Sequence, residues 1–351
     1  MEKIKVLLVD DSAVVREVLT SELSRDPQIH VLGAAHDAYA ARDKIVSMAP
    51  DVVLLDIEMP RMDGLTFLRK LMHYHPVPVI IVSSLTMPGG QLALDAIGSG
   101  AVDVMCKPGP GLELSEMTEM LLAKIKAAAQ VKFDRSPKQP SNAEADLTTP
   151  LTLTGPLRRI VAIGASTGGT RAIETILRRF PKNGPATLIV QHMPAYFTAS
   201  FAQRLNKSCQ MEVKEAADGD AVRPGLALIA RGNTHMLLRH HAGQLQVQVK
   251  DGPMVHHQRP SIEVLFQSMT RCLGVKVVAA LLTGMGSDGA QGLLALREHG
   301  AYTIAQDHET SVVFGMPAAA IRCGAACEVV PLHRIAESLL SHACNHTPVA
   351  K

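Results

Sequence analysis

Short apolar runs alternate with amphipathic segments through the first 130 residues of the chain. Five runs are rich in β-branched residues and are bounded by polar or turn-forming residues; they cover 5–10, 31–35, 51–56, 77–84 and 102–108. Apolar positions at helical spacing lie between and after them, at 13–23, 65–74 and 114–129. Strand and helix patterns that alternate in this way predict a doubly wound parallel sheet with helices on its faces.

The pattern stops after this region and then resumes. Residues 129–156 contain three prolines before Pro156 and no sustained periodicity, which is typical of a linker. Apolar runs return at 160–166, 186–194, 226–232, 277–286, 302–307 and 328–332, with helical patterns at 170–179, 261–273 and 291–299. The sequence therefore predicts a first α/β domain over residues 1–128, a linker over 129–156 and a second doubly wound α/β domain over 157–347.

Composition agrees with two domains, because 351 residues are more than one compact core usually holds. A hydrophobic content of 47% with 19% charged residues is typical of a soluble globular protein, and no apolar run reaches the ~20 residues that span a bilayer. The first residues indicate a strand and not a signal peptide. The six cysteines lack metal-type pairing, and we expect Cys323 and Cys327 to be a buried pair. These features predict a cytoplasmic protein with reduced thiols that is not embedded in a membrane.

The net charge of +2 hides two unequal halves. Residues 1–156 carry 15 basic and 20 acidic side chains, a balance of −5, whereas residues 157–351 carry 20 and 13, a balance of +7. The basic excess is spread over a whole α/β domain without a helix-turn-helix pattern, so we expect no nucleic-acid partner. The opposite signs predict an attraction between the two domains that added salt weakens.

Polar residues with complementary chemistry end four of the predicted strands of the first domain. Asp10 and Asp11 follow the first strand, Asp56 ends the third, Ser83 ends the fourth and Lys107 follows the fifth. The carboxyl ends of parallel strands share one edge of the sheet, where ligands bind. Three carboxylates there would repel one another unless a hard cation lay between them, and Mg²⁺ suits carboxylates, waters and a phosphate. The hydroxyl and the ammonium suit the oxygens of a phosphoryl group.

The second domain places a serine, a histidine and an aspartate at the ends of three predicted strands. Ser166 lies in Gly-Ala-Ser-Thr-Gly at a strand-to-helix turn, the G-x-S-x-G pattern of a nucleophile elbow. His192 ends a second apolar run, and Asp288 lies in the loop after a third. A parallel sheet would gather them along one edge, where His192 would activate the Ser166 hydroxyl and Asp288 would orient the imidazole. The amides of residues 284–286 are candidates for binding an oxyanion.

The residues alone leave other interpretations of the second domain open. The glycine-rich turn at Ser166 would also suit a phosphate at a helix N-terminus, although neither a P-loop nor a G-x-G-x-x-G pattern accompanies it. A domain that binds a partner without catalysis is a second alternative. The chain order Ser, His, Asp differs from that of α/β-hydrolases. The histidine pairs 240–241 and 256–257 are expected in solvated loops, and weaker candidates for the cleft are Asp307, His308 and Arg259.

The first domain resembles the receiver domains of two-component response regulators over residues 4–128. The motifs D-D, D-I-E-M-P-x-M-D-G, V-S-S and K-P, in this order at the strand ends, carry the resemblance. It implies a flavodoxin-like (βα)5 receiver in which Asp56 accepts a phosphoryl group from a histidine kinase. One departure is Val104, which stands where many receivers place an aromatic switch residue, so aromatic gating is not implied.

The receiver resemblance also implies roles for the other residues of the acidic pocket. Asp10, Asp11 and Asp56 would bind Mg²⁺. Ser83 and Lys107 would sense the acyl phosphate formed on the aspartate.

Four motifs of the second domain, together with an N-terminal receiver, resemble the chemotaxis response-regulator methylesterase family, CheB. They are I-G-A-S-T-G-G, V-Q-H-M-P, R-P-S-x-x-x-L-F and L-L-T-G-M-G-S-D-G-A-x-G, spread over residues 159–331. The resemblance implies a catalytic triad of Ser166, His192 and Asp288 in an esterase domain without a cofactor. Thr167 would lie beside the nucleophile and the Met285 amide near the oxyanion.

The same resemblance implies an activity and partners. Members of the family hydrolyse glutamate γ-methyl esters on methyl-accepting chemoreceptors with release of methanol, and some deamidate receptor glutamines. Their unphosphorylated receiver partly occludes the active site, and phosphorylation by the chemotaxis histidine kinase relieves this. The expected partners are therefore the receptors and the kinase, at a membrane-bound receptor array. The sequence leaves open which receptors are substrates, whether deamidation occurs, whether an acyl-enzyme accumulates, whether the linker binds a receptor tail, and the oligomeric state.

Overall fold

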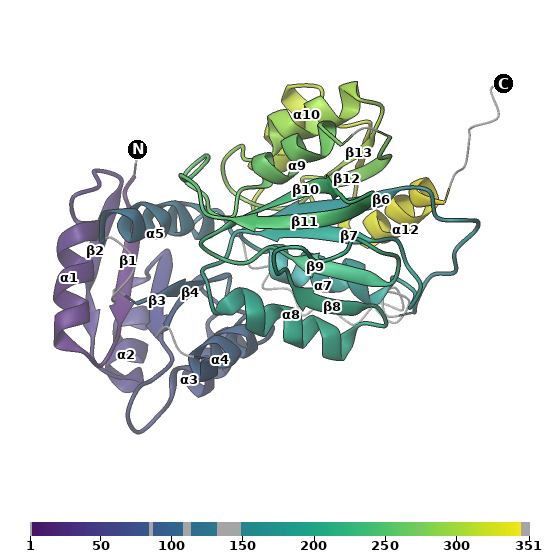
Figure 1. The fold of residues 1–351 in the computed structure, drawn as a ribbon. Coiled ribbons are helices and arrows are strands. Elements are labelled where there is room, and N and C mark those ends of the chain that lie inside the picture. The colour runs from purple at the N-terminus through teal and green to yellow at the C-terminus, as the bar shows by residue number, and fades with distance from the viewer. Residues whose placement is uncertain (1, 84–86, 108–113, 132–148, 273, 345–351) are drawn as a thin grey trace. The chain divides into compact units, whose positions relative to one another are not determined.

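The structure is a computed structural model that describes residues 2–83, 87–107, 114–131, 149–272 and 274–344 (Figure 1). The chain divides into two compact units, Met1–Pro137 and Lys138–Lys351. Residues 132–148 of the predicted linker and residues 345–351 lie outside the described part. No helix within the described part is long and apolar enough to cross a membrane.

The first unit is built on a five-stranded parallel sheet, as predicted. Its strands are β1 (Ile4–Val9), β2 (Ile29–Ala35), β3 (Val52–Asp56), β4 (Val79–Ser83) and β5 (Asp103–Cys106). Its helices are α1 (Ala13–Leu23), α2 (Ala38–Met48), α3 (Gly64–Tyr74), α4 (Met87–Gly98) and α5 (Leu114–Ala128). The strand order β2-β1-β3-β4-β5 reverses its direction of growth at β1, which creates a switch point between β1 and β3. Doubly wound sheets bind ligands at such points.

Local sequence explains why these elements form where they do. β3 and β4 are buried at every position and consist of Val, Leu and Ile before one polar end residue, as expected for central parallel strands. The side chains of Ser12, Asp37 and Asp63 accept backbone hydrogen bonds in the first turns of α1, α2 and α3 and so cap them. Because β1 pairs with β3, Asp10 after the one strand lies near Asp56 at the end of the other.

The second unit contains a seven-stranded parallel sheet in the order β14-β13-β12-β6-β7-β9-β8. Its strands are β6 (Ile160–Ala165), β7 (Thr187–Gln191), β8 (Glu212–Glu215), β9 (Leu226–Ile229), β12 (Val277–Leu281), β13 (Tyr302–Gln306) and β14 (Glu328–Val330). A separate antiparallel hairpin consists of β10 (His235–His241) and β11 (Gln244–Lys250). The central strands β12, β6 and β7 are the three that precede the candidate triad residues.

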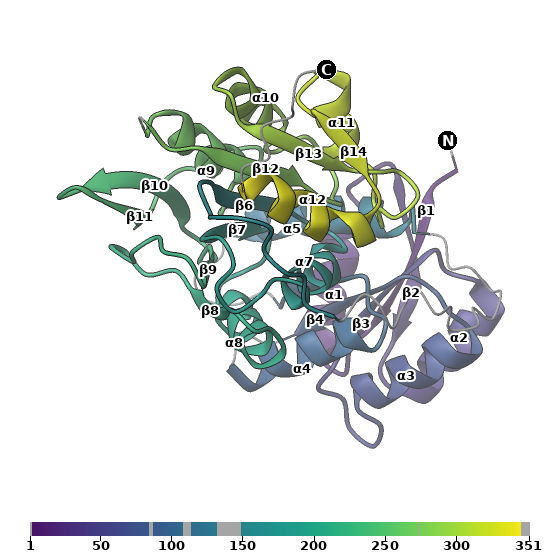
Figure 2. The ribbon, with the colours of Figure 1, turned by 90° about the vertical axis from the view of Figure 1, so that its right-hand side faces the viewer.

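Helices cover both faces of this second sheet (Figures 1 and 2). One group consists of α7 (Gly169–Arg178), α8 (Phe197–Ser208) and α12 (Leu332–Ala343), and the other of α9 (Ile262–Thr270), α10 (Ala290–Glu298) and α11 (Met316–Arg322). Leu265 and Phe266 of α9 belong to a buried cluster with Ala162 and Leu188 of the sheet. The hairpin joins the same cluster through Met236, so it helps to hold α9 in place.

Two expectations about the second unit are wrong. His240 and His241 are exposed as predicted, but they end strand β10 and are not in a loop, because Ala242 and Gly243 form the turn that pairs β10 with β11. The proposed buried cysteine pair also fails. Cys323 is only half-buried and Cys327 is exposed, because α11 ends before them and the two do not share a helix. The strand β8 and the hairpin were not predicted at all.

Candidate active site

The first unit brings the predicted polar residues together at the carboxyl edge of its sheet. Oxygens of Asp10, Asp11 and Asp56 lie within 4.8 Å of one another. Lys107 Nζ lies 3.0 Å from Asp10 Oδ2 and 2.7 Å from Asp56 Oδ2. Ser83 is completely buried at the end of β4, and no described residue forms a hydrogen bond with its hydroxyl. All five predicted residues of the acidic pocket therefore lie in one place or at its edge.

Burial and charge act in opposite directions in this pocket. Burial raises the pKa of Asp56 to about 6, although Lys107 opposes the rise and Asp10 adds a smaller increase. Burial also disfavours the charge of Lys107, but the two carboxylates outweigh it and raise the pKa of the ammonium above its ordinary value. The pocket thus combines a permanently charged ammonium with a carboxylate that is poorly stabilised.

The donor set fits a hard cation together with a phosphoryl group. Clustered carboxylate oxygens are the ligands that Mg²⁺ prefers. The buried hydroxyl of Ser83 and the ammonium of Lys107 are hydrogen-bond donors suited to phosphoryl oxygens. Val104 is buried in β5, so its position contributes a small apolar side chain to the core.

In the second unit, Ser166 and His192 are neighbours because β6 and β7 pair in register. Ala165 lies opposite Gln191, and each strand continues by one residue, to Ser166 and to His192. The His192 amide donates to the Ala165 carbonyl oxygen over 3.1 Å, and Gln191 Nε2 donates to the Ser166 carbonyl oxygen over 2.9 Å. The sheet itself therefore fixes the backbone of both residues.

Asp288 accepts four hydrogen bonds, one from His192 and three from the start of α9. Its Oδ2 lies 2.8 Å from His192 Nε2 and accepts the Ile262 amide over 2.7 Å. Its Oδ1 accepts the Ser261 hydroxyl over 2.8 Å and the Glu263 amide over 3.1 Å. Burial disfavours the charge of this carboxylate, but the hydrogen bonds outweigh it and keep the pKa of Asp288 below its ordinary value. Asp288 is therefore an anion that orients the His192 ring.

The second ring nitrogen of His192 is the one available for proton transfer. Because Nε2 faces the Asp288 carboxylate, it carries the proton in the neutral ring, and Nδ1 is an acceptor. Nδ1 is buried and has no hydrogen-bond partner among the described residues. A base in this state suits the hydroxyl of the adjacent Ser166.

The loop after β12 lies against the nucleophile, but only part of it suits an oxyanion. A Cβ at Gly284 would lie 2.6 Å from Ser166 Cβ, so a side chain here would collide with the nucleophile. The Gly284 amide is not available, because it donates to the Val313 carbonyl oxygen over 3.0 Å. Within the described part, no acceptor is bonded to the amides of half-buried Met285 and exposed Gly286. The prediction that the amides of residues 284–286 bind an oxyanion is therefore wrong for Gly284, and only Met285 and Gly286 stay as candidates.

Thr167 follows the nucleophile and is also buried. Its carbonyl oxygen accepts the hydroxyl of Thr283 over 3.0 Å, which ties the turn after β6 to the loop after β12.

Sequence reasoning missed the residues that position Asp288. Ser261 caps α9, and its hydroxyl reaches the carboxylate while the first amides of the helix do the same. The Ser261 amide lies 3.2 Å from Nδ1 of buried His235, whose Nε2 lies 2.9 Å from the Pro253 carbonyl oxygen. The signal was present in R-P-S before an amphipathic helix, because a helix N-terminus stabilises a carboxylate.

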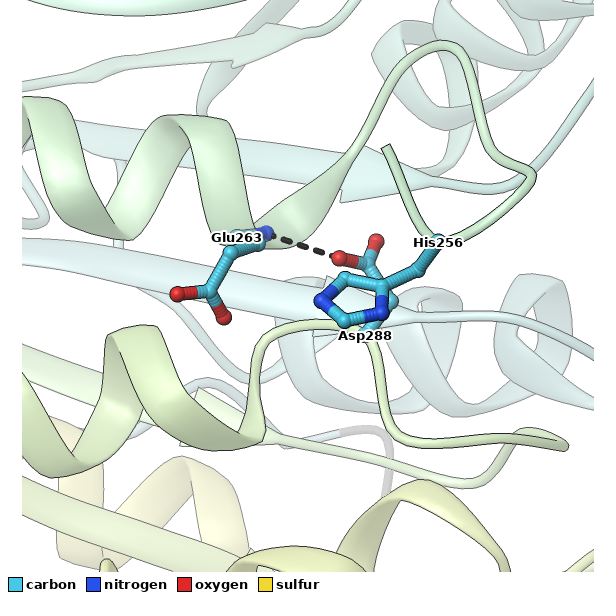
Figure 3. A group of neighbouring side chains, drawn as sticks. All are labelled: His256, Glu263 and Asp288. Carbon is cyan, nitrogen blue, oxygen red and sulfur yellow. Dashed lines mark hydrogen bonds between the residues drawn. The ribbon is translucent and has the colours of Figure 1, made fainter. Parts of the chain in front are cut away.

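His256 lies beside this network (Figure 3). It offers, with Glu263 and Asp288, three potential metal ligands within 4.8 Å. However, both Asp288 oxygens already accept two hydrogen bonds, and the Glu263 carboxylate accepts Gln267 Nε2 over 3.0 Å and the Gly292 amide over 2.7 Å. A metal ion would have to displace hydrogen bonds at Asp288 and compete with those at Glu263. We therefore interpret the group as a histidine beside hydrogen-bonded carboxylates and not as a metal centre.

The weaker candidates have structural partners. Asp307 Oδ1 accepts the amide and the hydroxyl of Thr310 over 3.0 and 2.6 Å. The His308 ring packs edge-on against Phe314 with centroids 5.0 Å apart. Arg259 Nη1 donates to a backbone oxygen, that of Gly252, over 3.0 Å. None of these contacts involves the candidate triad.

Comparison with known families agrees with this division of the chain. Residues 161–339 match the family model described as CheB methylesterase, and residues 6–119 match the response regulator receiver domain. The chain belongs to the CheB methylesterase family. Its second unit is the esterase domain, and its first unit is a receiver.

Relatives of nearly the same length share this arrangement. A protein from Syntrophus aciditrophicus named protein-glutamate methylesterase/protein-glutamine glutaminase 2 is 51% identical over 340 residues, which cover 97% of this chain and 99% of the relative. The enzyme of the group 3 operon of Rhodopseudomonas palustris, with the same activity name, is 49% identical over 97% of this chain and 96% of its own. The crystal structure of the Thermotoga maritima CheB methylesterase catalytic domain is 38% identical, with a TM-score of 0.51, and covers 54% of this chain and 99% of that chain.

Proposed function

We propose that this methylesterase hydrolyses the γ-methyl esters of glutamate residues on chemoreceptors, releases methanol, and also hydrolyses the side-chain amide of receptor glutamines. The observation that carries the proposal is the strand pairing that places Ser166 next to His192, together with the 2.8 Å contact between His192 Nε2 and the ionised Asp288 at the same sheet edge. The activity names of relatives about 50% identical support the substrate. The enzyme would act in the cytoplasm, at the membrane-bound receptor array.

Each step of this hydrolysis has a residue suited to it. The Ser166 oxygen attacks the ester carbonyl carbon while its proton passes to His192 Nδ1. Asp288 stays ionised and stabilises the imidazolium through Nε2. The Met285 amide faces the oxyanion, and Thr167 lies beside the nucleophile. The imidazolium then returns its proton to the methoxy oxygen, methanol leaves, and a water hydrolyses the acyl-enzyme to the glutamate carboxylate.

The receiver would control this activity through phosphorylation of Asp56 by a histidine kinase. Asp10, Asp11 and Asp56 would hold Mg²⁺, which neutralises the carboxylates so that a phosphoryl group can approach. Lys107 and Ser83 would donate to the phosphoryl oxygens. The buried Ser83 hydroxyl, which has no hydrogen-bond partner among the described residues, and the ammonium between two carboxylates support this role.

Replacing the nucleophile tests the proposal. Ser166→Ala removes the attacking oxygen, so methanol release from methylated receptor membranes should fall at least about 10³-fold. The rate that remains should be the small residual activity typical of triad variants. Ser208→Ala, at the end of α8, is the matched control and should keep the wild-type rate. Retention of the rate by Ser166→Ala would show that the esterase works through another group.

A further inference from the structure

Three surface loops of the esterase domain join into a continuous border beside the triad, which we name the triad rim: residues 194–196, 231–233 and 256–259. A Cβ at Gly232 would lie 2.2 Å from the Ala195 amide nitrogen, so the first two loops are in close contact. The Asn233 amide donates to the Arg259 carbonyl oxygen over 3.1 Å, which connects the third. The rim begins two residues after His192 and ends two residues before Ser261, so it adjoins the reaction centre by chain connectivity.

The rim concentrates unfavourable backbone conformations. Tyr196, Asn233, His256 and His257 have φ angles of 72, 60, 53 and 58°. Among the described residues of this domain, Ala242 is the single other non-glycine residue with positive φ. The left-handed region suits glycine, and Asn and His occupy it more often than most residues do, whereas a bulky Tyr is rare there. Strained residues of this kind persist where a side chain serves a purpose that glycine cannot.

His256 and His257 form the tip of a tight turn. The Val255 amide donates to the Gln258 carbonyl oxygen over 3.1 Å, and the Gln258 amide donates back over 3.0 Å. Two central residues with positive φ between such a pair make a type I′ turn, which normally contains Asn-Gly. Both histidines are exposed, and the His256 ring lies beside the carboxylate of Asp288 (Figure 3).

Tyr196 supplies an aromatic surface in the first loop of the rim, four residues after His192. It is 53% exposed, and it is the single exposed aromatic residue among the described residues of the esterase domain. Exposed Arg231 and half-buried Arg259 lie in the same rim as the two histidines. An aromatic ring combined with cationic and imidazole donors is suited to an acidic polypeptide surface.

We propose that the triad rim is the docking surface for an acidic segment of the protein substrate on either side of the esterified glutamate, with Tyr196 and the His256–His257 turn as its contacts. The inference rests on the proposed function, which supplies a protein substrate whose hydrolysed product is itself an acidic side chain. It assigns Tyr196 and the turn to substrate specificity and leaves the bond-breaking steps to the triad.

The test compares a large and a small substrate. Wild-type, Tyr196→Gly and Tyr196→Phe enzymes are assayed for methanol release from methylated receptor membranes and from N-acetylglutamate γ-methyl ester, which lacks the flanking polypeptide that would contact the rim. Glycine fits the backbone at this position, so Tyr196→Gly should keep or raise the Tm. It should raise KM for the receptor about tenfold. The ratio of kcat/KM for the receptor to kcat/KM for the small ester should fall by the same factor, whereas Tyr196→Phe should keep the wild-type ratio.

Two further variants complete the test. Ala242→Gly relieves a positive φ of 48° away from the rim and should leave the ratio unchanged. The double variant His256→Asn with His257→Asn keeps the turn and should raise the receptor KM. A wild-type ratio in both Tyr196→Gly and the double variant would overturn the docking proposal. Absence of methanol release by the wild-type enzyme from either substrate would instead contradict the proposed function, so the two failures are distinguishable.

Discussion

The receiver and the esterase domain each place a buried aspartate at the carboxyl edge of a parallel sheet, but the two domains treat it in opposite ways. Asp56 is 1% exposed, and burial raises its pKa to about 6 despite Lys107. Asp288 is 2% exposed, and there the hydrogen bonds outweigh burial, so its pKa is lowered. Burial alone therefore does not set the direction in which the pKa of an aspartate shifts, because hydrogen-bond donors around the carboxylate can outweigh the effect of burial.

This difference matches the work that each carboxylate would do. Asp56 Oδ1 accepts the Glu58 amide over 3.1 Å, and Oδ2 faces the ammonium of Lys107. It keeps lone pairs for a metal ion and a phosphoryl group. A carboxylate has about four acceptor positions, and Asp288 fills all four, so it can orient His192 but has no position left for another ligand.

The largest expected effect comes from removing the charge of Asp288. Asp288→Asn retains the size of the side chain but no longer stabilises the imidazolium, so kcat should fall on the order of 10³- to 10⁴-fold with little change in KM. Methanol release measured over a range of receptor concentrations gives both constants. Asp307→Asn, also an aspartate beyond a strand end, is the control and should behave as wild type. A change below tenfold in Asp288→Asn would mean that the esterase does not need the anion.

The second prediction concerns Asp56. A small-molecule phosphoryl donor with Mg²⁺ should raise the esterase rate of the wild-type protein, and Asp56→Ala should lower the ratio of rates with and without donor to one. The physical reason is that Asp56 ends β3 with an oxygen that faces Lys107 and lies in one cluster with the oxygens of Asp10 and Asp11. The measurement is methanol release with and without donor. A ratio of one in the wild-type protein would contradict control by the receiver.

A smaller effect is expected from Ser261, which we describe as a positioning residue. Ser261→Ala removes one of the four donors to Asp288 and the cap of α9, so kcat should fall about tenfold and the stability by about 1–2 kcal/mol. Ser12 caps α1 with the same 3.4 Å bond to a backbone amide. Ser12→Ala should therefore lower the stability of its own domain without changing kcat. Equal kcat values for the two variants would show that the hydroxyl does not orient the triad.

The smallest effect concerns stability in acid. The folded-state pKa of Asp288 lies below its ordinary value, so its ionisation stabilises the fold above about pH 4, and this contribution is lost as the pH falls through the folded-state pKa. The loss is about 1.4 kcal/mol for each unit by which the pKa is lowered. Chemical denaturation between pH 3 and 6 gives the free energy of unfolding at each pH. This free energy should fall less steeply with decreasing pH in Asp288→Asn than in wild type. An identical pH dependence of the free energy of unfolding in the two proteins would contradict the lowered pKa.

Much of the candidate site was predictable because its residues end apolar runs. Ser166, His192 and Asp288 each follow a strand of the central sheet, and the rule that parallel strands share one carboxyl edge brings them together. Ser261 was not predictable in the same way, since it precedes a helix and its hydroxyl reaches a residue 27 positions away. The hairpin of β10 and β11 was missed because its pairing is separate from the repeating strand–helix pattern.

The alternation of apolar and polar positions determined by itself the two parallel sheets and the residues at the strand ends. Periodicity and chain order are local properties, so they can be read without coordinates. The tertiary structure decided which His192 nitrogen faces Asp288 across 96 residues, that the Gly284 amide is already used, and in which direction the pKa of each buried aspartate shifts. These outcomes depend on differences of tenths of an ångström and on local burial, which packing sets and composition does not record.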